Sequence, residues 1–159
     1  MRLSWVFGVF LFCTSVVTVQ ADVPREILNI TERLFLNPDS PAVAGVAKIH
    51  QPDLINELYQ QSRHRPLWSL GEAGSLLELL RSSEREGLNP SDYHYNELLA
   101  LLAQEGEAWT DPDVLQAQFD VLLSDGLVLY ARHLLEGKID PRSLDETWNY
   151  DRREYDSED

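Results

Sequence analysis

Cysteine is almost absent from the sequence, which contains a single one, Cys13. It lies in an apolar run, Trp5 to Val19, that follows a positively charged start and ends in the small-residue segment Val19-Gln20-Ala21. This pattern is typical of a cleavable export signal, so we expect residues 1–21 to be a signal peptide and the protein to be periplasmic. An uncleaved anchor is the alternative. The mature chain then has no thiol, which excludes disulfides, thiol catalysis and cysteine metal sites from it.

Basic side chains are also scarce. Lysine and arginine together number 13, against 27 aspartates and glutamates, and the formal net charge is −14. A surface this acidic repels the phosphates of nucleic acids and of anionic lipids. We therefore expect no nucleic acid among the partners and, after signal cleavage, no membrane.

Known catalytic and metal-binding motifs are missing as well. The sequence has no HExxH, no EF-hand loop, no phosphate-binding glycine-rich loop and no Gly-x-Ser-x-Gly. No two of its histidines are spaced to share a helix turn; they are His50, His64, His94 and His133. Close acidic pairs such as Glu84 and Glu86 arise from composition, and a hydrolase that uses buried carboxylates is only an alternative. The residues alone predict no catalytic, cofactor-binding or metal site.

What the sequence does contain is one long helical segment. Asp111-Pro112-Asp113 is a typical helix start, with Asp111 as N-cap and Pro112 at the first helical position. No further proline occurs before Gly137, which suits the left-handed position after a helix, with Ile139 as the apolar contact that follows. These signals predict a helix over about residues 112–136.

This helix is predicted to be covered on two sides. One face is apolar apart from a glycine and a histidine, with a tyrosine beside it: Leu115, Phe119, Leu122, Gly126, Leu129, His133 and Tyr130. A second apolar stripe lies on the far side: Ala117, Val121, Val128 and Leu135. One narrow strip is polar: Gln118, Asp125, Arg132 and Glu136. A helix that is apolar on two sides must be covered on both, so we expect it at the centre of the fold.

Three residues of this helix invite interpretation. Asp120 lies between the apolar stripes, and we favour a structural carboxylate bonded to an arginine or a backbone group over a functional acid. Gly126 is expected either to permit a close helix crossing or to be a plain weakness in the helix. His133 is interpreted as a hydrogen-bonded core histidine, not a catalytic one.

Shorter helices are expected around this one. Helix-start signals predict one helix from Val23-Pro24 and another from Gln51-Pro52-Asp53. A third helix is expected from about Ala73, stopping at Glu86-Gly87-Leu88, and a turn or short helix follows at 89–93. A further helix is expected through Leu98 to Leu102, finishing near Gly106, and a last short one from Asp140 to Trp148. Strand patterns are lacking. The predicted fold class is all-α, an irregular bundle of about five to six helices around the one at 112–136.

The chain divides into four parts by composition. After the signal peptide we expect an N-terminal helix and linker (22–50), a helical domain (51–150) and a frayed acidic tail (151–159). Within the linker, Asn37 to Ala47 is expected to be a loop.

The segment Arg63 to Trp68 should be extended, because Pro66 disfavours helix at the residue before it. It carries the only cationic cluster with an aromatic neighbour, built around His64. We favour a solvated loop that packs Trp68 inward over a site for an anion or a sugar.

An ordered set of short segments runs from about Gln51 to Trp148. They are Leu58-Tyr59; Arg65-Pro66-Leu67-Trp68; Leu76 to Leu80; Glu86-Gly87-Leu88-Asn89-Pro90-Ser91-Asp92-Tyr93; Phe119-Asp120-Val121-Leu122-Leu123-Ser124; Tyr130-Ala131; Glu136-Gly137-Lys138-Ile139-Asp140-Pro141; and Trp148. Together they resemble the scaffold domain at the N-terminal side of the large periplasmic L,D-transpeptidases of Gram-negative bacteria. The resemblance implies a helical domain that packs beside a peptidoglycan-binding domain and a catalytic domain.

The same resemblance bears on activity. The family forms 3-3 cross-links in peptidoglycan with a cysteine in a Ser-His-Gly-Cys motif, and this sequence has neither that motif nor any cysteine after Cys13. We therefore expect no enzyme in this chain by itself. We interpret it as a non-catalytic N-terminal piece of such an enzyme, incomplete at the end of its helical domain. Its expected partners are the catalytic and peptidoglycan-binding domains, with peptidoglycan as a further candidate. The alternative is a stand-alone periplasmic adaptor that binds a cell-wall synthesis enzyme.

Overall fold

The computed structural model describes residues 22–40, 43, 47–105 and 111–138. These residues form, in order, α1 (Val23–Leu36), α2 (Pro52–Gln61), α3 (Leu70–Ser82), η1 (Ser83–Glu86), η2 (Pro90–Tyr93), α4 (Tyr95–Leu102) and α5 (Pro112–Glu136), where η marks a 3₁₀ helix. In this part of the chain the only strand-like pairing is an isolated bridge between Val43 and Ala47. The predicted all-α class is confirmed. The predicted signal peptide, the helix at 140–148, the tail and Ile139 lie outside the described residues.

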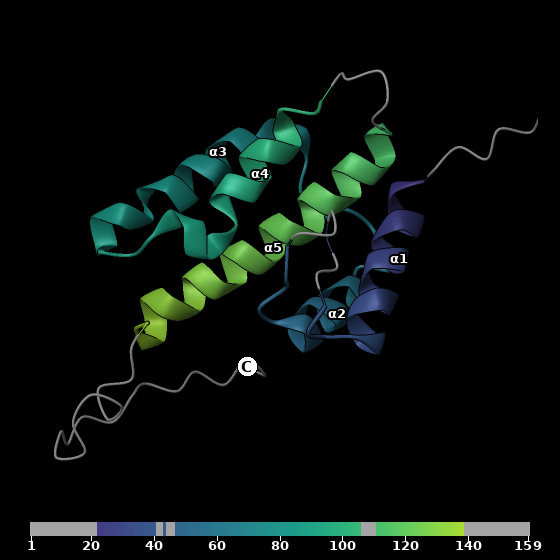
Figure 1. Ribbon diagram of the computed structural model, residues 1–159, viewed down its shortest axis with the longest axis horizontal. Helices are drawn as coiled ribbons and strands as arrows, with labels where there is room; N and C mark the ends of the chain where they lie inside the picture. Colours follow the sequence, from purple (N-terminus) through teal and green to yellow (C-terminus); the bar gives the residue numbers. More distant parts are fainter. Residues whose placement is uncertain (1–21, 41–42, 44–46, 106–110, 139–159) are drawn as a thin grey trace, which may run out of the picture.

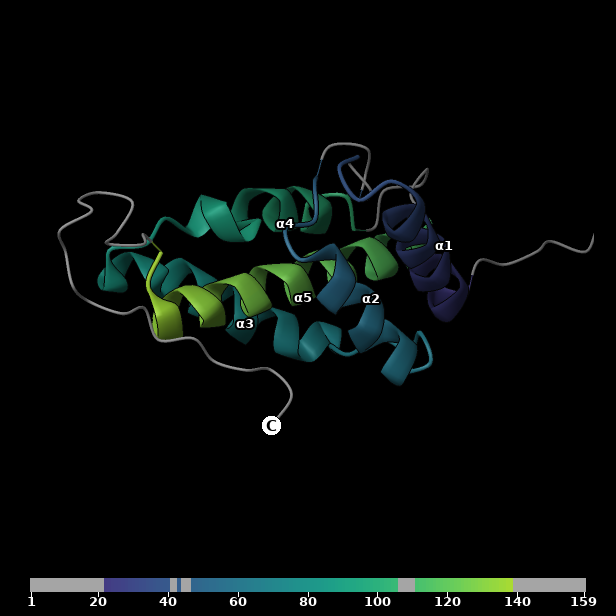
Figure 2. The ribbon, with the colours of Figure 1, turned by 90° about the horizontal axis from the view of Figure 1, so that it is seen from below.

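Helix α5 occupies the centre of the bundle. Figure 1 shows it crossing the molecule diagonally, with α1 and α2 on one side and α3 and α4 on the other. Figure 2, turned by a quarter turn, shows α5 running between α4 above and α3 below, with α1 and α2 toward one end. Helix α5 contacts all four other α-helices of the described chain. The predicted bounds and the two-sided cover are therefore confirmed.

The burial of α5 exceeds the prediction in its middle. Every residue from Phe119 to Gly126 is buried, so the cover there extends around the whole circumference. The prediction grouped Asp125 with the residues of one narrow polar strip, but its side chain lies in the core and is 0 % exposed. At the far end Leu135 is half-exposed, so the second stripe is not covered along its full length.

The helix starts follow the local signals in the sequence. Asp111 accepts a hydrogen bond from the backbone N–H of Asp113 at 3.0 Å, and prolines lie in the first turns of α1, α2 and α5. Helix α3 begins at Leu70, earlier than the predicted Ala73. The reason is that the Ser69 backbone N–H donates to the Glu72 carboxylate at 3.0 Å, which satisfies a donor at the helix start.

Two helix ends differ from the prediction. Gly87 is left-handed as expected, but Gly137 has φ 82° and ψ 148°, so the chain leaves α5 in an extended direction. Arg63 and His64 are left-handed, with φ of 56° and 58°, where an extended segment was predicted. They close the end of α2, since the His64 N–H bonds the Tyr59 carbonyl at 2.7 Å. The restriction from Pro66 applies only to the residue directly before it.

The hydrophobic core is continuous from α1 to α5. Ile27 and Leu34 of α1, Ile55 of α2 and Leu80 of α3 are fully buried in the same cluster as Leu122 of α5. Several large apolar residues of the short helices are exposed: Leu28, Phe35, Leu54, Leu79 and Leu99. Each short helix is covered on one side only, so an apolar residue at the edge of its stripe remains in solvent. No helix in the described part of the chain is both long enough and apolar enough to cross a membrane.

Candidate functional site

Asp120 is a buried carboxylate whose hydrogen bonds come from a hydroxyl and two backbone amides. Its Oδ1 accepts from the Tyr59 hydroxyl at 2.6 Å, its Oδ2 accepts from Trp68 N at 3.0 Å, and both oxygens lie 3.1 Å from Leu67 N. The residue is 1 % exposed. The predicted bonding of this carboxylate to backbone groups is confirmed, and the preferred structural role stays a prediction. Its effect is to fasten the segment after α2 to the middle of α5.

Ser124 extends this arrangement by one helix turn. Its Oγ accepts from Trp68 Nε1 at 2.8 Å, lies 2.9 Å from the Tyr59 hydroxyl and donates to the Asp120 carbonyl at 2.9 Å. We call Asp120, Ser124, Tyr59 and Trp68 the Asp120 cluster. Trp68 therefore packs inward, as predicted, and the segment that carries it is held by side chains of α5.

The charges of the Asp120 cluster are set by burial. Burial raises the pKa of Asp120 above its usual range, because the groups that act to lower it, the Tyr59 hydroxyl and two amides, are neutral donors. Burial, together with the nearby carboxylate, also raises the pKa of Tyr59. A phenol that keeps its proton donates a hydrogen bond at all physiological pH values, so this cluster is suited to holding structure.

Asp125, five residues farther along α5, is approached by two histidines. His50 lies just before α2, and His94 lies between η2 and α4. Asp125 Oδ2 is 2.7 Å from His94 Nε2 and 3.0 Å from His50 Nδ1, and the two ring nitrogens are 3.0 Å apart. We call these three residues the histidine–aspartate cluster.

The carboxylate of Asp125 also holds the start of α2. Its Oδ2 accepts from the His50 backbone N–H and its Oδ1 from that of Gln51, each at 2.9 Å. Asp125 is 0 % exposed, His94 is buried, and the His50 side chain is 41 % exposed. The cluster is thus closed on the α5 side and open to solvent on the His50 side.

Sequence reasoning missed this cluster. It treated the histidines as scattered, because His50 and His94 are 44 residues apart and His94 and Asp125 are 31 apart. The one available signal was a second aspartate within the apolar middle of α5, where each buried carboxylate needs partners. Among the other histidines, His64 follows the end of α2 and is not a member of this cluster.

Opposing influences determine the charge of Asp125. Burial acts to raise its pKa, but hydrogen bonds from His50 and His94 outweigh burial and lower the pKa to about 2. The hydrogen bond to Asp125 in turn raises the pKa of His50. The carboxylate is therefore ionised and is matched to positive charge.

The chemistry open to this cluster is limited by its neighbours. Among the described residues, no serine, threonine or cysteine side chain hydrogen-bonds to His50 or His94. A nucleophile activated by histidine, as in acyl-transfer enzymes, is therefore not formed by these residues. Two imidazoles and one carboxylate are, however, able to share a proton or to coordinate a metal ion.

Gly126 lies beside the same cluster and confirms the predicted close approach. A Cβ on Gly126 would collide with the backbone carbonyl of Tyr93, so η2 packs against α5 without room for a side chain there. The Tyr93 hydroxyl is 3.0 Å from His133 Nδ1, which confirms His133 as a hydrogen-bonded histidine. It is half-buried, at the edge of the core.

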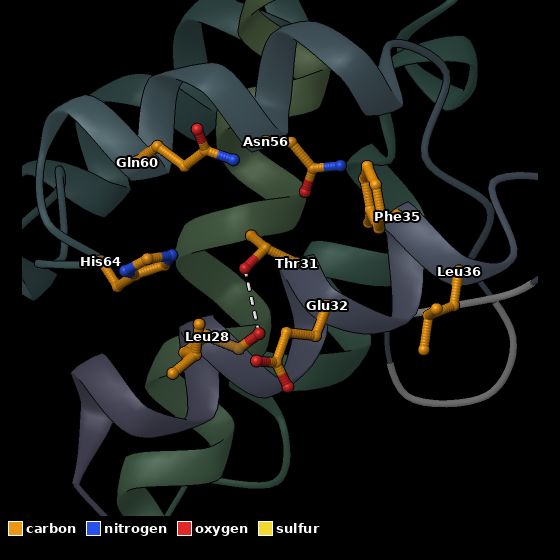
Figure 3. Close-up of a pocket in the computed structure, with 8 residues that line it drawn as sticks. All are labelled: Leu28, Thr31, Glu32, Phe35, Leu36, Asn56, Gln60 and His64. Atoms are coloured by element: carbon orange, nitrogen blue, oxygen red, sulfur yellow. Dashed lines mark hydrogen bonds between the residues drawn. The ribbon is translucent and has the colours of Figure 1, made fainter.

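Two grooves open beside the helices. The first, between α1 and α2, encloses about 510 Å³ and is lined by Leu28, Thr31, Glu32, Phe35, Leu36, Asn56, Gln60 and His64. Figure 3 shows Asn56 and Gln60 of α2 facing Thr31 and Glu32 of α1 across it. The second groove, of about 830 Å³, lies between α2 and the C-terminal half of α5, and His50 lines it. His64, the centre of the predicted cationic cluster, thus faces a groove, while Arg63 and Arg65 are exposed.

Comparison with known proteins gives one match. A family model described as a scaffold domain matches residues 53–159, which is more than half of the chain. No curated protein and no solved structure matches.

Proposed function

The chain belongs to the scaffold domain family, and from this premise we propose that it is the non-catalytic scaffold region of a periplasmic peptidoglycan L,D-transpeptidase. In this role it holds a catalytic domain and a peptidoglycan-binding domain in register. The observation that supports the proposal best is the Asp120 cluster, which joins the segments of the sequence resemblance to one another in space.

The hydrogen bonds of that cluster connect three of these segments. Tyr59 belongs to the first, Leu67 and Trp68 to the second, and Asp120 and Ser124 to the one on α5. Tyr93, from a fourth segment, packs its backbone against Gly126. The residues that carry the resemblance therefore hold the helices of the bundle together. A domain whose distinctive residues make internal hydrogen bonds is suited to positioning other domains, not to chemistry of its own.

The lack of a thiol agrees with a positioning role. The transfer of an acyl group through a cysteine needs a thiolate, and the sequence has no cysteine after Cys13. The cysteine of the reaction must then be supplied by another domain or chain.

Exposed apolar side chains offer surfaces for such a partner. Phe35 and Leu36, at the end of α1, are 78 % and 72 % exposed. Leu134 and Leu135, at the end of α5, are half-exposed. Neighbouring exposed apolar residues mark contact sites more often than isolated ones do. The two pairs lie at different ends of the bundle, so each is able to meet a different domain (Figure 1).

The proposal is tested with the mature chain and an isolated L,D-transpeptidase catalytic domain. We expect the chain alone to form no cross-links from tetrapeptide donors and to bind the catalytic domain in calorimetry. The double variants Phe35→Asp/Leu36→Asp and Leu134→Asp/Leu135→Asp should show which surface is used. Leu79→Asp, at an exposed position on α3, is the matched control and should bind normally.

Two results would argue against this function. Cross-linking or muropeptide release by the chain alone would make it an enzyme. The absence of binding to the catalytic domain, together with binding to a complete cell-wall synthase that has its own scaffold, would favour the stand-alone adaptor instead.

A further inference from the structure

We propose that His50, His94 and Asp125 bind a divalent transition-metal ion, with zinc as the best fit. This inference is independent of the proposed scaffold function, because it rests only on the histidine–aspartate cluster. The ligand atoms are His50 Nδ1, His94 Nε2 and Asp125 Oδ2, one from each residue.

The three atoms form a compact triangle with sides of 2.7, 3.0 and 3.0 Å. Zinc binds nitrogen and carboxylate oxygen at about 2.0–2.2 Å, and tetrahedral ligands at that distance lie roughly 3.3 Å from one another. An ion would therefore lie just outside the plane of the triangle, and the ligand atoms would need to separate by only a few tenths of an ångström.

Hydrogen bonds alone satisfy this triangle poorly. If both ring nitrogens carry protons, both donate to Asp125 Oδ2, but their two N–H groups then lie against each other at 3.0 Å. If only one ring nitrogen carries a proton, that proton makes one hydrogen bond. One of the other contacts then places the lone pair of a nitrogen against Asp125 Oδ2 with no hydrogen between the two atoms. A cation that accepts all three lone pairs removes both conflicts.

The ligands are held in place before an ion arrives. Asp125 is fixed by the backbone N–H groups of His50 and Gln51, which leaves Oδ2 directed at the imidazoles. His94 is fixed by its buried, left-handed position between η2 and α4. Such surrounding hydrogen bonds orient the ligands of natural metal sites and raise their affinity.

The open side of the cluster supplies access and a remaining coordination position. His50 is part-exposed and lines the groove of about 830 Å³ between α2 and α5, so an ion and a water molecule reach the triangle from there. Two imidazoles, one carboxylate and an open position form a donor set that suits zinc or iron(II) and that calcium and magnesium do not prefer.

The test uses the mature chain, prepared without a polyhistidine tag and stripped with EDTA. We expect calorimetry to give one bound Zn²⁺ per chain and the melting temperature to rise with added Zn²⁺. Co²⁺ should give the visible absorption of a four- or five-coordinate site. His50→Ala should weaken Zn²⁺ binding by about 100-fold or more, since it removes a ligand outright. His64→Ala, a histidine in the other groove, is the matched control and should leave binding unchanged.

A measurement on the unaltered chain guards against variants that fold poorly. In histidine ring nitrogen spectra, Zn²⁺ should shift Nδ1 of His50 and Nε2 of His94, and it should leave His64 and His133 in place. Stoichiometric binding with these shifts supports the site. Binding that is weaker than millimolar, binding unaffected by His50→Ala, or shifts confined to His64 and His133 would overturn it.

Discussion

Asp120 and Asp125 are two aspartates five residues apart on one helix, with 1 % and 0 % of their surface exposed. Burial alone should affect them alike, because removal from water disfavours the charged form of any carboxylate. Yet the pKa of Asp120 is raised, and that of Asp125 is lowered to about 2. The two clusters therefore differ in their partners and not in their depth.

The partners of Asp120 are a phenol and backbone amides, which stay neutral and only partly compensate for burial. Asp125 has backbone amides too, but it also has two imidazoles, which are able to carry positive charge. The comparison shows that the identity of the donors decides whether the pKa of a buried carboxylate is raised or lowered. Three experiments test it, in order of the expected effect.

The largest difference should come from replacing each aspartate by asparagine. In Asp120→Asn the side-chain amide fits a neutral site. Its oxygen accepts hydrogen bonds from the backbone N–H groups of Leu67 and Trp68, and its NH₂ donates to the Tyr59 hydroxyl. The Tyr59 hydroxyl then donates its proton to Ser124 Oγ. We expect Asp120→Asn to cost less than about 1 kcal/mol. Asp125→Asn removes the charge that pairs with the imidazoles and sets an NH₂ against other donors, at a cost of about 3 kcal/mol.

The measurement is urea unfolding of both variants in EDTA at one pH. Asp53→Asn, at an exposed position, serves as the control and should change the free energy of unfolding by less than about 0.5 kcal/mol. Equal losses of unfolding free energy in Asp120→Asn and Asp125→Asn would mean that the charge of the hydrogen-bond partners does not distinguish the two clusters.

Much of the fold was predictable because the signals are local. Pro52 and Pro112 begin their helices as the sequence indicated, and Gly87 ends one in the left-handed conformation. The central place of α5 followed from its two apolar stripes. The left-handed Arg63 and His64 were not predicted, because no glycine marks that helix end.

The candidate site was only partly predictable. A carboxylate at position 120 among apolar residues must find partners, so its hydrogen bonds to backbone groups followed from the sequence, although Tyr59 and Trp68 could not be named in advance. The burial of Asp125 was not predicted, because the helical wheel groups it with Arg132 and Glu136 on a polar strip. Only the tertiary approach of His50 and His94 covers it, and such contacts leave no local pattern.

An intermediate effect is expected from Gly126→Ala. Alanine favours helix over glycine by about 1 kcal/mol, but here its Cβ meets the rigid carbonyl of Tyr93, so we expect a net loss of about 2 kcal/mol. Because His94 follows Tyr93, the displacement should reach the histidine–aspartate cluster and spare the Asp120 cluster. Histidine ring signals should shift, while the Trp68 indole N–H signal stays.

Gly74→Ala supplies the matched control for that variant. Gly74 lies in α3 with nothing within 4 Å of an added Cβ, so alanine should stabilise the protein by up to about 1 kcal/mol. If Gly126→Ala were equally stabilising, the backbone of η2 would not be packed against α5 as the structure has it, and the link between the glycine and His94 would be lost.

The smallest effect is a pair of opposite pH dependences in metal-free protein. Asp125 has a lowered pKa, so its contribution is present above the ordinary value of 3.8 and is lost as pH falls toward about 2, with about 1 kcal/mol gone by pH 3. Asp120 has a raised pKa, so the folded state takes up its proton first, and the free energy of unfolding rises as pH falls through that raised value toward 3.8.

Subtracting the stability curve of each asparagine variant from that of the unaltered chain cancels the contributions of the other carboxylates. The two difference curves should slope in opposite directions as pH falls below the raised pKa of Asp120 toward about 3. Curves that slope in the same direction would show that neutral and chargeable donors affect the ionisation of a buried aspartate in the same way.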